Sequence, residues 1–351
     1  MLPAPRKLAA VSASVPLPVL DLSGFRSNPD GPDGVAFVEA LRDAFHGIGA
    51  AYLVGHGVAD GLIARVRRLA EEFFALPEAE RLAIENVHSP QFRGYTRLGN
   101  EHTNGLRDLR DQIDIGREEP APEIGPDDPA WLRLRGPNQW PEALPAFRAA
   151  VTEYNAALEQ TGHVLMRAVS LALGQPADHF DAQVTPPEVL TKIIRYPAPS
   201  ESFPTDQGVG HHTDAGFLTL LHQDAVGGLE AEVHGAWVPV PALPGAFVLN
   251  IGELLQLVSN GYFRATLHRV VSPPVGVQRI SVAYFFNPSF EARIAPVTLP
   301  AALAAEAPGG ESADPENPIL ANYGFNTLKV RLRAHPDVAE RHHADLLART
   351  T

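Results

Sequence analysis

The 351-residue sequence contains no cysteine. This absence excludes disulfide frameworks, thiolate zinc sites, iron–sulfur clusters and cysteine nucleophiles. Any bound metal must therefore be held by histidine and carboxylate side chains. A chain without disulfides is also typical of a reducing compartment, so we expect a cytoplasmic location.

Positive charge is scarce as well, because the formal net charge is -13. Binding to a phosphate backbone or to an anionic membrane requires a basic surface, so we expect neither a nucleic acid nor a membrane as a partner. No apolar run approaches the roughly 18 residues of a transmembrane helix. We expect a small-molecule substrate and a monomer or weak dimer. An anionic co-substrate is not excluded, since one buried arginine can bind a carboxylate.

The first half of the chain predicts mainly helices. Residues 1–15 are expected to form a loose arm, followed by short strands at 19–22 and 50–54. Apolar residues recur at helical spacing over 35–45, 62–74 and 142–173. Residues 88–140 are expected to be irregular, apart from the alternation Gln112-Ile113-Asp114-Ile115. We therefore expect a helical region over 16–175.

The second half of the chain has a different residue pattern. Short β-rich runs alternate with glycine, proline and asparagine, which is the pattern of a β-sandwich or small barrel. These runs cover 189–196, 216–222, 228–233, 236–240, 246–251, 262–271 and 278–286. A helical tail is expected from Asn322 to Leu347, with Pro336 marking a kink or a new start. We expect one domain over 1–351, with a mixed α+β fold, a β core over 186–295 and the tail over 318–351.

One two-ligand motif for a metal, His-x-Asp, occurs five times. On a strand, residues i and i+2 share a face, so both side chains can reach one ion. His335 and His343 fall in the helical tail, where they are expected to be solvated, and His179 falls in a polar connector. His212 and His222 both flank a β run and remain candidates. The five matches are His179–Asp181, His212–Asp214, His222–Asp224, His335–Asp337 and His343–Asp345.

Further residues favour the match at His212. His268 lies in an apolar run and offers a third ligand, and eleven residues later Arg279-Ile280-Ser281 enters another strand. Strand alternation puts Arg279 and Ser281 on one face. A buried guanidinium needs an anionic partner, either a ligand or a core carboxylate in a structural salt bridge. His211 is expected to point away from Asp214, to the surface or a supporting layer.

The segment Gly210-His211-His212-Thr213-Asp214-Ala215-Gly216-Phe217-Leu218-Thr219-Leu220-Leu221 resembles the metal-binding strand of the isopenicillin N synthase-like family of iron(II)/2-oxoglutarate-dependent oxygenases. In that family a distal histidine follows about 50–60 residues later, and Arg-x-Ser follows about ten residues after it; the two histidines and the aspartate are the ligand set of non-haem iron(II). The intervals from Asp214 to His268 and from His268 to Arg279 are similar. The resemblance extends over roughly residues 16–335 and includes Gly55–Val58, Gly227–Glu230, Trp237–Pro241 and Asn250–Glu253.

This resemblance implies the fold and the chemistry. The core would be a double-stranded β-helix, or jelly roll, with the N-terminal helices packed on it and a C-terminal helical tail. His212, Asp214 and His268 would hold Fe(II), and Arg279 with Ser281 would bind 2-oxoglutarate. O2 would be the second co-substrate. The dioxygenase would hydroxylate or otherwise oxidise a small organic molecule and release succinate and CO2.

The segment Ile194-Arg195-Tyr196-Pro197 departs from the family pattern. Tyr196 matches a tyrosine that often contacts the oxoacid, and we expect it at the cofactor site. Arg195 is similar to the arginine in Leu-Arg-Phe-Pro of bacterial ethylene-forming relatives. It is expected either near the co-substrate or on the surface of a strand. Desaturation, cyclisation and ethylene formation therefore stay open as alternatives to hydroxylation.

The sequence gives less information on the substrate, and two other functions are considered. Candidate substrate contacts flank the expected barrel mouth, although loop packing or salt bridges would also account for them: Phe92, Arg93, Tyr95, Glu101, Asp114 and Phe286. A zinc hydrolase would use the same triad but would give Arg279 and Ser281 no role. A non-catalytic β-sandwich binding protein would typically lack one triad residue. Abundant arginine, alanine and proline suggest a GC-rich bacterial genome, and we expect a role in bacterial secondary or amino-acid metabolism.

Overall fold

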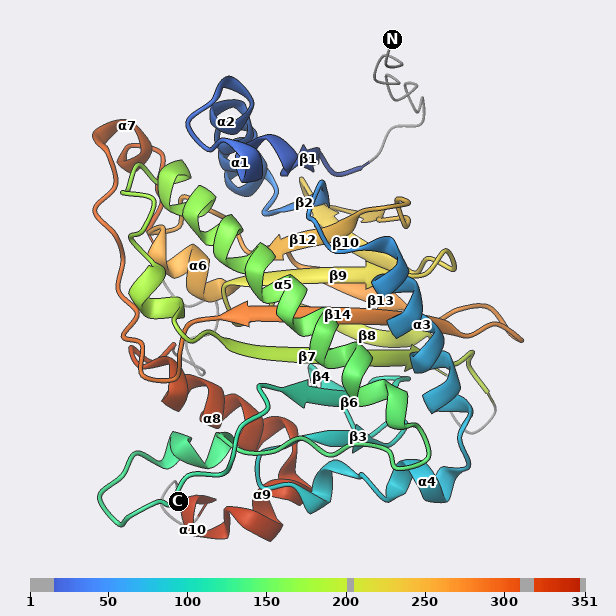
Figure 1. The fold of residues 1–351 in the computed structure, drawn as a ribbon. Helices are drawn as coiled ribbons and strands as arrows, with labels where there is room; N and C mark the ends of the chain where they lie inside the picture. Colours follow the sequence, from blue (N-terminus) through green and yellow to red (C-terminus); the bar gives the residue numbers. More distant parts are fainter. Residues whose placement is uncertain (1–15, 201–204, 310–318, 348–351) are drawn as a thin grey trace.

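The computed structural model describes residues 16–200, 205–309 and 319–347 (Figure 1). The loose arm expected over 1–15 lies outside the described residues, as do both ends of the tail expected over 318–351. Among the described residues, no helix is long and apolar enough to cross a membrane.

Two sheets face each other and form the jelly-roll core that was expected. The larger sheet has eight strands, and only the β1–β2 pair is parallel. In spatial order these are β1 (Val19–Asp21), β2 (Ala50–Val54), β12 (Phe247–Ile251), β9 (Leu218–Gln223), β14 (Arg279–Asn287), β7 (Glu188–Tyr196), β6 (Asp111–Gly116) and β3 (Gly94–Thr96). The smaller sheet comprises β11 (Ala236–Pro239), β10 (Leu229–Val233), β13 (His268–Val271) and β8 (Gln207–His212). A two-stranded ribbon joins β4 (His102–Thr103) to β5 (Leu106–Arg107).

Helices cover the outer face of the large sheet and close its lower edge. In Figure 1, α5 runs across the strands of the large sheet with α3 beside it, and α8 to α10 lie beyond β3. The α-helices are α1 (Ser23–Ser27), α2 (Pro32–Gly47), α3 (Asp60–Ala75), α4 (Glu78–Leu82), α5 (Pro145–Ala172), α6 (Glu253–Val258), α7 (Ala301–Ala304), α8 (Tyr323–Ala334), α9 (Pro336–His342) and α10 (Ala344–Leu347). Short 3-10 helices are η1 (Asn86–His88), η2 (Ala130–Leu134) and η3 (Asp181–Val184).

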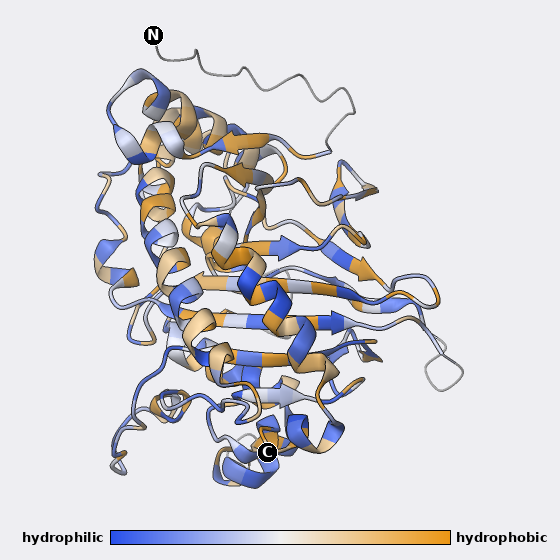
Figure 2. Cartoon of the chain, turned by 45° about the vertical axis from the view of Figure 1, so that its right-hand side comes forward, coloured by the Kyte–Doolittle hydropathy of each residue, from blue (hydrophilic) through white to orange (hydrophobic). Residues whose placement is uncertain are grey.

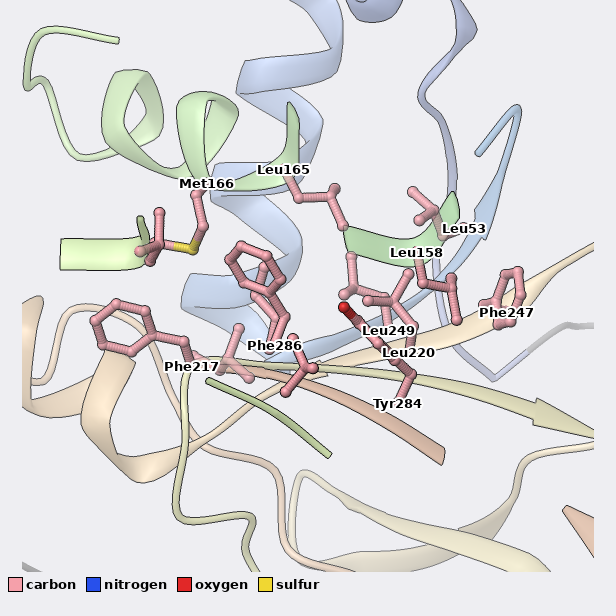
Figure 3. Close-up of a cluster of buried hydrophobic side chains, with 14 of the residues drawn as sticks. Leu53, Leu158, Leu165, Met166, Phe217, Leu220, Phe247, Leu249, Tyr284 and Phe286 are labelled. Atoms are coloured by element: carbon pink, nitrogen blue, oxygen red, sulfur yellow. The ribbon is translucent and has the colours of Figure 1, made fainter. Parts of the chain in front are cut away.

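The main hydrophobic core lies between α5 and the large sheet. Leu158, Leu165 and Met166 of α5 point at buried side chains of the strands, among them Phe286 (Figure 3). Figure 2 shows apolar residues along α5 and along the strands that it covers. Burying such a side chain contributes roughly 1.5–3 kcal/mol, so this layer is the main source of stability.

Strand alternation divides β14 between the core and the interior of the jelly roll. Ile280, Val282, Tyr284 and Phe286 belong to the core under the helices, whereas the residues between them line an internal cavity. Phe286 was therefore wrongly proposed as a substrate contact. Its neighbour Phe285 lines the cavity instead.

The observed elements confirm most of the expected ones and correct two. The helices expected at 35–45, 62–74 and 142–173 are α2, α3 and α5, and Pro336 begins α9. The segment 88–140 is less irregular than expected, because β3 and β6 extend the large sheet. The region 16–175 is thus not purely helical. The strand expected over 262–271 begins only at His268.

The packing of α5 on β14 gives a stability prediction. A Cβ atom on Gly162 would lie 2.3 Å from the fully buried ring of Phe286. Overpacking of this kind costs about 1–3 kcal/mol. Gly162→Ala should therefore lower the free energy of unfolding, measured by urea denaturation, despite a gain of about 1 kcal/mol in helix propensity.

Gly61→Ala is the matched control in α3. A Cβ atom on Gly61 would meet no heavy atom within 4 Å. The control should leave stability unchanged or raise it by up to about 1 kcal/mol. If both variants shifted stability in the same direction, close packing of α5 on Phe286 would not be the cause.

Candidate metal centre and its cavity

His212, Asp214 and His268 meet at one end of the small sheet. His212 is the last residue of β8, and His268, the first of β13, is its direct partner in the antiparallel register. Asp214 lies in the loop after β8. Its Oδ1 atom is 3.8 Å from the Nε2 atom of each histidine. Within the described part of the chain, this is the one group of three such side chains with metal-binding spacing.

Backbone carbonyls orient both imidazole rings. The Nδ1 atom of His212 is 2.9 Å from the carbonyl oxygen of Gly210, and that of His268 is 2.9 Å from that of Thr266. Donation from Nδ1–H leaves the lone pair on Nε2 directed at the shared space, as in many metal sites. The backbone thus selects the tautomer that binds a cation.

Two polar side chains hold the carboxylate. The Oδ2 atom of Asp214 accepts hydrogen bonds from Thr219 Oγ1 at 2.5 Å and Asn250 Nδ2 at 2.7 Å. Burial raises the pKa of Asp214, but the two histidines and these hydrogen bonds lower it below its usual value. Burial and the neighbouring His268 lower the pKa of His212 to about 4. Ionised carboxylate and neutral imidazole are the states that bind a metal.

The other four His-x-Asp histidines lie elsewhere. His222 points to the helix side of β9, where its ring centroid is 6.1 Å from that of Phe247. His179 is exposed in a turn before η3. His335 and His343 are both buried, so the expectation that they are solvated was wrong. The tail folds back onto the N-terminal region, and His343 stacks on Phe92 at 5.1 Å between ring centroids.

His211 points away from the metal triad, as strand alternation predicted. It is exposed, and its carbonyl oxygen accepts a hydrogen bond from Asn104 Nδ2 at 2.9 Å. Asn104 also lies 3.1 Å from its ring nitrogen Nε2. The residue therefore joins β8 to the turn between β4 and β5.

Arg279 presents an unpaired charge to the interior. Its side chain is fully buried, and Nη2 donates to Gln223 Oε1 at 3.2 Å. The Nε and Nη1 atoms have no hydrogen-bond partner, and neither has the Oγ atom of buried Ser281. Among the described residues, no carboxylate pairs with Arg279, which rules out the alternative of a structural salt bridge to one of them. The site thus needs an external anion.

Tyr196 and Arg195 lie on opposite faces of β7. The guanidinium carbon of Arg279 lies 4.7 Å from the ring centroid of Tyr196, which also lines the cavity. Arg195 instead donates to both oxygens of Asp111, at 2.9 and 2.7 Å, and covers the ring of Phe74. Arg195 therefore does not line the cofactor cavity, and its assignment to cofactor binding is corrected.

A cavity of about 340 Å³ connects the triad to Arg279 and Ser281. Strands of both sheets line it, and α8 covers it. Glu101 is the one proposed substrate contact that lines the cavity. Asp114 lies just behind the wall, where it binds Lys192 and Arg331.

The remaining substrate candidates support the wall from outside. Phe92 packs against His335 and His343, and Arg93 pairs with Glu188 at 3.3 Å. The hydroxyl of Tyr95 donates to Asp111 on the helix side of the sheet, at 2.8 Å. These residues were chosen because their segments were expected to flank the barrel mouth. That expectation did not tell which way each side chain points.

Sequence reasoning missed several polar groups of this site, Arg110 among them. Thr219 and Asn250 orient Asp214, and Glu188 and Lys192 line the cavity. A signal for the last two was present, since both share the alternation of β7 with Tyr196. Nothing local could have placed Arg331 of α8 beside them.

Comparisons with known proteins agree with this geometry. A family profile described as non-haem dioxygenase in morphine synthesis N-terminal matches residues 17–143, and the 2OG-Fe(II) oxygenase superfamily matches residues 189–288. The chain is 35% identical to homoarginine-6-hydroxylase of Arabidopsis thaliana, over 81% of this chain and 88% of that protein. It is 33% identical to the 2-oxoglutarate-dependent dioxygenase frbJ of Dothideomycetidae sp., over 93% and 91%.

Solved structures show the same architecture. A full-length Neurospora crassa protein in complex with alpha-KG and 5-formyluracil superposes with a TM-score of 0.72 at 27% identity, over 93% of this chain and 99% of that one. The rice dioxygenase for auxin oxidation superposes with a TM-score of 0.62 at 27% identity, over 90% and 95%. The relatives named here come from plants and fungi, so the bacterial source suggested by composition stays a prediction.

The unpaired charge of Arg279 predicts an unusual effect on stability. Arg279→Met should raise the free energy of unfolding of the ligand-free protein by on the order of 1–3 kcal/mol, because it removes an uncompensated buried charge. Arg195→Met is the matched control, since it breaks a paired arginine on the same sheet. The control should lose about 1–3 kcal/mol. Destabilisation by both substitutions in urea denaturation would mean that Arg279 is paired within the protein.

Proposed function

The chain belongs to the 2OG-Fe(II) oxygenase superfamily, of the isopenicillin N synthase-like type, and we propose that it hydroxylates a small, polar, nitrogen-containing molecule. It is a dioxygenase that uses Fe(II), 2-oxoglutarate and O2, as its family does. A zinc hydrolase and a non-catalytic binding protein are thereby set aside. The single observation that carries the site assignment is the pairing of a His-Asp-His triad with an unpartnered buried arginine in one cavity.

We propose His212, Asp214 and His268 as the iron ligands. Two imidazoles and one carboxylate on one face of an octahedron leave positions for two further reactants. The hydrogen bonds from Thr219 and Asn250 support this assignment, because they fix one carboxylate oxygen and leave Oδ1 facing the histidines. Supporting partners of this kind orient ligands in metal sites.

We propose that Arg279 and Ser281 bind the far carboxylate of 2-oxoglutarate. The free Nε and Nη1 donors of Arg279 suit a carboxylate, and the Ser281 hydroxyl can donate a further hydrogen bond. Tyr196 packs on the guanidinium and holds its plane. With iron and 2-oxoglutarate bound there, O2 would be the oxidant, and oxidation of 2-oxoglutarate would give succinate and CO2 as co-products. The chain's own residues bind, orient and exclude water.

The relatives support hydroxylation of a small polar molecule. The Arabidopsis relative is named for hydroxylation of homoarginine, and the Neurospora protein was solved with 5-formyluracil. Arg195 faces away from the cavity, so it gives no support for ethylene formation over hydroxylation. We also propose a cytoplasmic monomer or weak dimer without a nucleic-acid partner. The net charge of -13 supports the absence of a nucleic-acid partner, and the lack of cysteine supports a cytoplasmic location.

Iron binding tests the choice among the histidines. His268→Ala should abolish binding of Fe(II), measured by anaerobic titration calorimetry, because two ligands alone hold the ion weakly. His222→Ala is the control, since that ring lies on the helix-covered face of β9, away from the cavity. An equal loss of iron in a folded His222→Ala protein would refute the assignment.

Binding of 2-oxoglutarate tests Arg279. Arg279→Lys keeps the charge but loses the planar fork, so the Kd for 2-oxoglutarate in the Fe(II) complex should rise on the order of 10- to 100-fold. The visible charge-transfer band of the anaerobic complex is the readout. Pyruvate, an oxoacid without the far carboxylate, should bind both proteins with similar affinity. A parallel loss of pyruvate binding would place Arg279 at the iron end instead.

A further inference from the structure

Charged groups on the inner face of β7 lie along the cavity in a fixed order. Alternation brings Glu188, Leu190, Lys192 and Tyr196 to this face, and all four line the cavity. Tyr196 marks the Arg279 end. Glu188 and Lys192 lie on the remaining part, four residues and roughly 13 Å apart between Cα atoms. Neither Glu188 nor Lys192 has a role in the binding of iron or 2-oxoglutarate proposed above.

Lys192 and Arg331 form a cationic end with spare donors. Lys192 Nζ and Arg331 Nη1 share a single oxygen of Asp114, at 2.7 and 3.1 Å. Gln112 donates to the other oxygen at 2.8 Å. Both cations line the cavity, whereas Asp114 lies behind them. An ammonium has three donors and a guanidinium has five, so donors are left over for a ligand.

Three further charged groups lie at this end, one cation and two carboxylates. Arg110 pairs with Asp108 at 3.1 Å and with Glu101 at 3.5 Å. Glu101 also accepts a hydrogen bond from Gln112 at 3.0 Å. The Nε atom of Arg110 has no hydrogen-bond partner, so Arg110, like Lys192 and Arg331, has donor capacity left at this end. The ligand group that accepts from several such donors is a carboxylate.

Glu188 forms an anionic end, where Arg93 is its ion-pair partner among the described residues. Its side chain is buried, and from the described residues it accepts one long hydrogen bond, from Arg93 Nη2 at 3.3 Å. Burial raises the pKa of Glu188, and Arg93 offsets this only in part. A buried carboxylate gains from a charged donor, so the matching ligand group is a cationic nitrogen.

The strand register places the metal triad level with the middle of this row. Leu190 pairs with Phe285, Phe285 pairs with Thr219, and Thr219 pairs with Asn250. Thr219 and Asn250 are the two side chains that hold Asp214. Leu190 is midway between Lys192 and Glu188 on the strand. A ligand that reaches both ends therefore has its middle atoms at the height of the triad, with Thr219 two strand spacings, roughly 10 Å, across the sheet from Leu190.

We propose that the substrate is an aliphatic molecule with a carboxylate at one end and a cationic nitrogen at the other. Lys192 and Arg331 bind the carboxylate, Glu188 binds the nitrogen, and an interior carbon faces the metal triad. This inference rests on the proposed function and deepens it.

Substrate-stimulated formation of succinate tests the class with the iron-loaded wild-type enzyme. Two-ended probes are 6-aminohexanoate, L-lysine and L-homoarginine, and one-ended probes are hexanoate and hexylamine. Two-ended compounds should raise succinate formation above the rate without substrate, and one-ended compounds should not. Equal stimulation by a one-ended compound overturns the proposal.

Variants of the two ends test the residue assignment. Arg331→Met and Glu188→Gln should each raise the KM of the best two-ended probe on the order of 10- to 100-fold. Arg331→Lys should retain most of the affinity. Arg333→Met, an exposed position on the same helix, is the matched control and should change nothing. An unchanged KM in both folded cavity variants overturns the assignment.

Basal turnover separates this proposal from the proposed function. Consumption of 2-oxoglutarate without substrate, and its Kd, should be the same in wild-type protein and in the exposed control Arg333→Met. If basal turnover persists and no two-ended probe stimulates it, the substrate class is wrong and the oxygenase assignment stands. If wild-type protein neither binds nor consumes 2-oxoglutarate, both fail together.

Discussion

The fully buried guanidinium of Arg279, without a carboxylate from the described residues, is the constraint around which the cavity is built. Every other charged group that lines the cavity wall pairs with a neighbour, such as Lys192 with Asp114. Arg279 instead retains free donors beside Ser281. A dianionic co-substrate therefore completes the charge balance of the interior, and its binding stabilises the folded state in proportion to its concentration over its Kd.

Along β7 and β14, side-chain alternation puts the residues of one face in the hydrophobic core or on the helix side, and those of the other face in the cavity. One face of β14 packs on α5, and the other carries Arg279 and Ser281. On β7, Tyr196 faces the cavity while Arg195 pairs with Asp111 on the far side. Because one sheet serves both purposes, the helices that bury its outer face also hold the cavity wall in place.

The C-terminal tail completes the cavity from a distance. Arg331 of α8 reaches Asp114, and the stack of His343 on Phe92 pins the end of the tail to the N-terminal region. Arg133 adds an ion pair with Asp345 at 2.7 Å. Residues near 92 thus act on the site indirectly, since they hold the helix that supplies one of its cations.

The sequence by itself predicted the group His212, Asp214 and His268 and the Arg279–Ser281 pair. Strand alternation predicts the His-x-Asp and Arg-x-Ser pairs, and the family resemblance links them to His268. The sequence also predicted the helices and most strands, whose patterns are local. Only the tertiary structure decided which face Arg195 and Phe286 occupy, since alternation does not say which face is inside. It also brought Arg331 to Lys192, because contacts between residues so far apart in the chain depend on the packing of the whole fold and leave no local pattern.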